Sequence, residues 1–165
     1  MKLDKGNFIR IIESNQGIIT SLCKAYYGSP EDQKDVFQDI VLQLWKSFET
    51  FRGDSKVSTW IYSVSLNTIL TKVRDEKNKI AAESISCSEV VLSKSMADDD
   101  TELLSMVLQS LKDLDKAIVI LYLEGYKNKE ISQILNLTPS NISTRLNRLR
   151  TELQAKFKSQ HYEFR

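Results

Sequence analysis

The sequence has few of the residues that build metal sites and disulfide frameworks. Its 165 residues include two cysteines, Cys23 and Cys87, and a single histidine, His161. Two cysteines this far apart match neither a disulfide framework nor the paired ligands of a zinc site, and one histidine adds no pair of its own. We therefore expect no metal ion and a reduced, cytoplasmic setting.

Glycine, proline and long apolar runs are also scarce. With five glycines, two prolines and no alternation of period two, the chain is expected to fold as an all-α protein. No apolar run approaches the roughly 18 residues of a membrane-spanning helix, and we expect no secretion signal because the first ten residues lack an apolar block. No catalytic constellation stands out, so we expect no enzyme, no catalytic residue, no cofactor and no small-molecule substrate.

The chain as a whole has almost no net charge, but single segments are strongly charged. The net charge of +1 excludes a uniformly basic nucleic-acid-binding protein. Residues 138–158 nevertheless hold five basic residues against one acid, Glu152, whereas Ala97–Asp100 reads ADDD. Such segregation is typical of a protein that meets a polyanion with one face. Compensation of a helix dipole is the alternative, and it accounts for the last basic residues but not for Arg145.

Apolar residues predict a three-helix bundle in residues 1–77. They recur at helical spacing in the ranges Phe8–Tyr26, Phe37–Phe48 and Trp60–Val73. Gly28 is expected to end the first helix, with Ser29 as the cap and Pro30 in the first turn of the second helix. Gly53 marks the next turn. Three long helices with short connections form a compact bundle.

A serine-rich segment and a second helical block follow. Residues 78–101 lack apolar periodicity, and we expect them to form a linker whose acidic end is solvated or mimics nucleic acid. These 24 residues reach at most roughly 80 Å when extended, which exceeds the roughly 70 Å of two turns of duplex DNA. The apolar periodicity of residues 102–165 predicts four helices, and Asn128 is expected to cap the third of them.

The last two helices show the pattern of a helix-turn-helix. Asn136 occupies the turn, where one residue near positive φ is needed, and Thr138 and Pro139 satisfy the rules for a helix start. Pro139–Lys156 is therefore predicted to be a recognition helix. The apolar residues expected to face inward are Ile131, Ile134, Leu135, Ile142, Leu146 and Leu149.

The polar face of this helix suits DNA. Small polar side chains allow close approach to base edges, arginine bonds guanine, asparagine bonds adenine, and a helix amino terminus favours phosphate. A solvated polar face on a small bundle is the alternative. The residues expected to meet DNA are Pro139, Ser140, Asn141, Ser143, Thr144, Arg145 and Arg148.

Two strings in the first block resemble a known family. DQKDVFQDIVLQLW, followed by SFETFRGDSKVSTWIYSVSLNTILTKVR, resembles region 2 of sigma-70 family RNA polymerase sigma factors, and the last block resembles region 4. The resemblance covers roughly residues 8–76 and 102–157. It is strongest to the extracytoplasmic-function class, which keeps only these two regions, and LYLEGYKNKEISQIL is similar to variants common in Bacteroidetes.

The resemblance implies a promoter-specificity subunit with several partners. It assigns core polymerase binding and minus-10 recognition to residues 1–77, and minus-35 recognition to residues 102–165. The implied partners are core RNA polymerase (the clamp helices of the largest subunit, and the flap), promoter DNA, and an anti-sigma factor, which in this family is often membrane-anchored. The implied polymerase-binding residues are Asp35, Gln38 and Asp39. The implied minus-10 residues are Phe51, Arg52, Gly53, Asp54, Ser55, Trp60, Asn67, Lys72 and Arg74, where Trp60 is equally well explained as a core residue.

Two other classes of protein remain open on the sequence. A two-domain transcriptional regulator would use the first block as a sensor or a dimerisation bundle, but it gives no reason for FRGDSKVSTW. A helical adaptor would leave both polar faces solvated, and it would bind no DNA.

Overall fold

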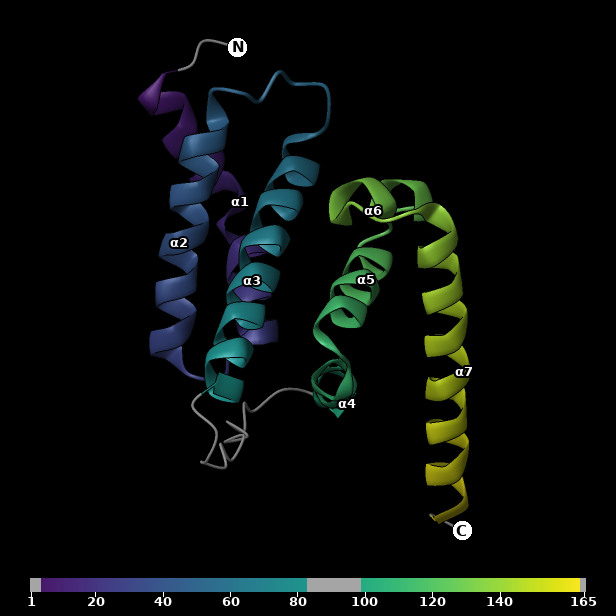
Figure 1. Cartoon of the computed structure of the whole chain (residues 1–165). Helices are drawn as coiled ribbons and strands as arrows, with labels where there is room; N and C mark the ends of the chain where they lie inside the picture. Colours follow the sequence, from purple (N-terminus) through teal and green to yellow (C-terminus); the bar gives the residue numbers. More distant parts are fainter. Residues whose placement is uncertain (1–3, 83–98, 164–165) are drawn as a thin grey trace. The chain divides into compact units, whose positions relative to one another are not determined.

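The computed structural model describes residues 4–82 and 99–163, and within these ranges it contains seven α-helices and no strand, as an all-α fold requires (Figure 1). None of the described helices is both long and apolar enough to cross a membrane. The contacts divide the chain into two units, residues 1–113 and 114–165. The helices are α1 (Lys5–Tyr26), α2 (Pro30–Phe48), α3 (Val57–Ala82), α4 (Asp99–Ser110), α5 (Asp113–Leu123), α6 (Asn128–Leu135) and α7 (Pro139–Glu163).

The first unit contains the predicted bundle of α1, α2 and α3. The expected start of α2 is confirmed, because the Ser29 hydroxyl accepts a hydrogen bond from the Asp32 amide at 3.1 Å and Pro30 is the first helical residue. Gly53 has a φ of 78° in the turn before α3, a conformation that favours glycine. The buried apolar core of the bundle includes Ile19, Leu22, Val36, Ile40, Leu44, Ile61, Leu66 and Ile69.

The helices extend into both ends of the expected linker. α3 continues to Ala82 and α4 begins at Asp99, while residues 83–98, with Cys87, lie outside the described residues. α4 belongs to the first unit, where Leu104 and Leu108 line a hollow beside α1 and the start of α2. The contacts therefore divide the chain after Asp113. The start of the second helical block at residue 102 stays a prediction.

Asp113 is fixed to the first unit by two side chains. The Tyr26 hydroxyl donates a hydrogen bond to the Asp113 carbonyl at 2.7 Å, and Lys77 forms an ion pair with the Asp113 carboxylate. Burial raises the pKa of Tyr26, and the nearby charge of Asp113 raises it further. The Tyr26 phenol is therefore protonated and able to donate this bond at any physiological pH.

The second unit holds the helix-turn-helix of α6 and α7. Asn136 has a φ of 54°, which confirms its predicted role, and the Leu137 amide closes the turn on the Ser132 carbonyl at 2.9 Å. Thr138 is confirmed as the cap of α7, because its hydroxyl accepts from the Asn141 amide at 3.2 Å. The residues expected to face inward are buried or, in the case of Leu146, half-buried.

The predicted cap of α6 is wrong. Asn128 is the first residue of the helix, and Lys127 holds the cap position. The Glu130 carboxylate, in the first turn of the helix, accepts a hydrogen bond from the backbone amide of the cap residue Lys127 at 2.8 Å. The Asn128 side chain instead donates to the Ser143 hydroxyl of α7 at 3.0 Å, and thereby ties the two helices together.

Candidate nucleic-acid interface

The exposed side chains at the start of α7 are small and polar. Pro139, Ser140, Asn141 and Thr144 are all exposed, while Ile142 is fully buried against α6. Side chains of this size leave the helix backbone free to approach a surface closely. The first turn also offers the positive end of the helix dipole, which favours a phosphate.

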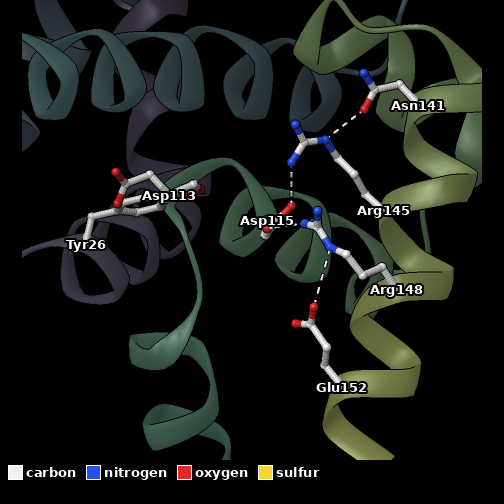
Figure 2. Close-up of polar contacts among 7 residues, drawn as sticks. All are labelled: Tyr26, Asp113, Asp115, Asn141, Arg145, Arg148 and Glu152. Atoms are coloured by element: carbon white, nitrogen blue, oxygen red, sulfur yellow. Dashed lines mark hydrogen bonds and ion pairs between the residues drawn. The ribbon is translucent and has the colours of Figure 1, made fainter.

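Two predicted readers on α7 are held by their own helix pair. Ser143 is half-buried and accepts the hydrogen bond from Asn128. The Asn141 side-chain oxygen accepts from Nε of Arg145 at 2.8 Å, one turn along the helix (Figure 2). Ser140 and Thr144 are therefore the exposed hydroxyls best placed to meet a ligand without first breaking a described contact.

Two arginines of α7 bind the same acid, a residue that was not predicted from the sequence to belong to the site. Asp115, on α5, accepts from Nη1 of Arg145 through one oxygen and from Nη2 of Arg148 through the other, both at 2.8 Å (Figure 2). Arg148 also lies 3.7 Å from Glu152. Both arginines were expected to face outward without a partner on the protein. The available signal was an acid three residues before Ile118, on the apolar face of its helix.

In the first unit, two predicted minus-10 residues stack on each other. The rings of Phe51 and Trp60 lie 4.8 Å apart and nearly parallel, at 25°. Trp60 is only 9% exposed and also contacts the ring of Phe48, so it belongs to the core. Phe51 covers it from outside and is half-buried.

The loop that follows Phe51 is accessible along its whole length. Arg52, Gly53, Asp54 and Ser55 are all exposed. Of the predicted residues on α3, Asn67 and Arg74 are exposed as well. Asn67 lines a groove between α2 and α3, together with Thr71 and Lys72. The groove is lined by amides, hydroxyls and two lysines, and also by the acids Asp39, Asp75 and Glu76.

The structure joins two residues that were expected to serve different partners. Nζ of Lys72, predicted to contact DNA, lies 2.6 Å from the carboxylate of Asp39, predicted to contact polymerase. The hydrogen bond that Lys72 donates to the Asp39 carboxylate is the main cause that raises the pKa of Lys72. Because both side chains are partly exposed, the pair contributes at most about 1 kcal/mol, and either partner is free to exchange it for another ion.

The other two predicted polymerase contacts lie beside an apolar groove. Asp35 and Gln38 are exposed on α2, and Gln38 lines the groove together with Ile9, Leu42 and Trp45. Trp45 belongs to the apolar repeat of Phe37–Phe48 from which the bundle was predicted, yet 44% of this residue is exposed. Its ring packs edge-on against Phe8 at 5.0 Å, and α1 therefore forms the other wall of the groove.

A metal ion has no evident place in this interface. The described residues contain no group of three or more histidine, cysteine or acidic side chains that could hold one.

Comparison with known proteins identifies two family regions along the chain. The chain matches the family model Sigma-70 region 2 over residues 11–79 and the model Sigma-70, region 4 over residues 101–153, together about three quarters of its length. It is 26% identical to the ECF RNA polymerase sigma-E factor of Haemophilus influenzae, over 93% of this chain and 88% of the relative. It is 24% identical to the ECF RNA polymerase sigma factor SigW of Bacillus subtilis, over 93% and 90%.

Solved structures share the fold. The sigma factor RpoE of Bartonella quintana, in complex with the anti-sigma factor NepR, superposes with a TM-score of 0.76 at 16% identity, over 92% of this chain and 97% of that one. CnrH, in complex with the cytosolic domain of CnrY, gives a TM-score of 0.65 at 18% identity, over 95% and 91%.

Proposed function

The chain belongs to the sigma-70 family, as an RNA polymerase sigma factor of the extracytoplasmic-function class, and on that premise we propose how its helices divide the work of promoter-specific transcription initiation. In this proposal α7 enters the major groove of the minus-35 element. The α2–α3 side of the first unit holds the minus-10 element as a single strand. The exposed face of α2 docks on core polymerase.

The proposed contact with the minus-35 element is supported by the residues at the start of α7. A recognition helix reads bases with its amino-terminal residues, and here those positions hold the exposed side chains of Ser140, Asn141 and Thr144. The Thr138 cap and the αL turn at Asn136 fix the direction in which the helix leaves the turn. Ser140 and Thr144 stand one turn apart on one face, where hydroxyls read base edges or bridging waters.

The proposed contact with the minus-10 element is supported by the exposed loop and by Phe51. A base extruded from the duplex loses stacking worth a few kcal/mol, and an aromatic face restores part of it. Phe51 provides such a face because Trp60 supports it from below. Asn67, Lys72 and Arg74 line the neighbouring part of α3, where they would contact bases or phosphates of the same strand.

Asp35, Gln38 and Asp39 are proposed to bind the clamp helices of the largest polymerase subunit. The exposed carboxylates would pair with basic side chains, while the apolar groove beside Gln38 buries surface in the same contact. The second unit is proposed to reach the flap. We also propose an anti-sigma partner, since the sigma factor RpoE of Bartonella quintana is in complex with one. The proposed factor works in the cytoplasm with core polymerase and has no enzymatic activity of its own.

Replacing Ser140 and Thr144 with alanine tests the minus-35 assignment. We expect run-off transcription from a cognate promoter to fall at least about fivefold, since each lost base contact costs about 1–3 kcal/mol of discrimination. Retention of core polymerase should not change. Gln154→Ala, an exposed substitution three turns further along α7, is the matched control. Unchanged transcription by the Ser140/Thr144 variant would show that α7 does not read this element.

A further inference from the structure

Asp115 is a charged residue in a position where a charge is costly. It is the third residue of α5, and its side chain is 4% exposed. A buried carboxylate is tolerated only when its oxygens are paired and hydrogen-bonded. Here both oxygens are used, one by each arginine, and the amino-terminal end of α5 adds the favourable end of a helix dipole (Figure 2).

The two arginines differ in how many N–H donors remain free after they bind Asp115. Arg145 is 29% exposed, and two of its nitrogens are occupied, one by Asp115 and one by Asn141. Arg148 is 49% exposed: its Nη2 donates to Asp115 and its Nε lies 3.7 Å from the Glu152 carboxylate, while no contact is described for its Nη1. Arg145 is therefore committed to holding the helix, whereas Arg148 is held at one end and keeps donors for a partner.

We propose that Asp115 is a positioning residue for minus-35 readout, which acts by holding Arg145 and Arg148. The inference rests on the proposed function of α7. A free guanidinium binds any phosphate, and phosphate contacts carry no sequence information. Asp115 neutralises the charge of one arginine and restrains the side chain of the other. It thereby lowers the attraction of α7 to DNA of any sequence, and leaves discrimination between sequences to the polar side chains at the start of α7.

This role predicts opposite changes in two quantities. If Asp115 only stabilised the fold, its loss would weaken binding to every DNA sequence alike. If it positions the arginines, its loss frees the nitrogens that Arg145 and Arg148 now give to Asp115, and these become available for phosphate contacts. Binding to unrelated DNA then strengthens while the preference for the cognate minus-35 sequence falls.

The test compares wild type with Asp115→Asn, which keeps the shape of the side chain and removes its charge. Each full-length protein, in complex with core polymerase, is titrated with two labelled duplexes over a range of salt concentrations. One duplex carries the minus-35 sequence that wild type selects from a randomised promoter library, and the other carries the same bases scrambled. A wild type without preference between them would refute the proposed function itself, before any variant is considered.

For Asp115→Asn we expect the preference to fall at least about fivefold, the affinity for the scrambled duplex to rise, and the salt dependence to steepen by about 0.9 for each phosphate gained. Equal weakening on both duplexes, with an unchanged ratio, would overturn the inference. Should this variant unfold, Asp115→Leu combined with Arg145→Met replaces the ion pair by apolar packing. This double variant is expected to fold and to lose preference through the released Arg148, and retained preference would overturn the inference equally.

Discussion

At the scale of single residues, Phe51 and Trp60 occupy one stack but lie at different depths. Trp60 is enclosed by Phe48 and Phe51, whereas Phe51 is half-buried and borders the exposed loop. A side chain at the border can exchange one neighbour for an incoming base, while the one beneath it supports the core. The open question of whether Trp60 is a core residue is thereby answered by its burial.

This difference predicts separate effects for two substitutions. Trp60→Ala should lower the free energy of unfolding by about 3–5 kcal/mol, the usual cost of removing a buried aromatic ring. Phe51→Ala should leave the thermal unfolding of the protein largely intact, but should reduce melting of the minus-10 element, since one base stack is worth about 1–3 kcal/mol. Circular dichroism and permanganate reactivity of promoter thymines measure the two effects. Thr50→Ala is the control, and full promoter melting by Phe51→Ala would refute the stacking role.

Residues governed by local rules were predictable, and residues governed by distant contacts were not. Asn136 and Thr138 follow from sterics and capping within a few residues of the chain. Asp115 is paired with residues 30 and 33 positions away, so its role depends on how α5 packs against α7. The same limit applies to Lys72 and Asp39, which are 33 residues apart.

At the scale of elements, α2 shows two faces with separate tasks. Val36, Ile40 and Leu44 are fully buried in the bundle, while Asp35 and Gln38 point away from that core. The helical periodicity of the sequence predicted Ile40 and Leu44 on the buried face, but it left out Val36 and included the exposed Trp45. It did not predict the groove formed with α1, because a pattern within one helix does not show which neighbouring side chains leave a hollow.

Replacing Asp35 and Gln38 together with alanine should weaken retention of core polymerase. The expected loss is at least about fivefold, since hydrogen bonds to charged groups contribute about 1.5–3 kcal/mol each. Pull-down with tagged sigma factor over a range of core concentrations measures it. Glu13→Ala removes an exposed acid from α1 and should retain polymerase like wild type. Equal retention by the Asp35/Gln38 variant and by wild type would place the docking surface elsewhere.

At the scale of the whole molecule, the segment between helices α3 and α4 is shorter than the linker that the sequence pattern predicts. The 24 residues expected as linker lose their ends to helices α3 and α4, which leaves residues 83–98 between them. Sixteen residues reach at most about 55 Å when extended. The composition indicated where the connection lies, but helix ends depend on packing such as that of α4 against α1 and α2, which composition does not report.

Both regions together also decide between classes of protein. A regulator with a sensor bundle, or a helical adaptor, would account for one unit at most, whereas the matches cover region 2 and region 4 in order. The similarity to Bacteroidetes variants stays a prediction. The central claim is that one chain recognises two separated promoter elements while it is bound to polymerase.

Run-off transcription with purified core polymerase and a randomised promoter library tests this claim most directly. We predict transcripts that depend on the chain, from templates that share two conserved elements at constant spacing, roughly two helical turns of DNA apart. Loss of Ser140 and Thr144 should relax only the upstream element. Transcription no greater than that of core polymerase alone, or enrichment of a single element, would contradict the account.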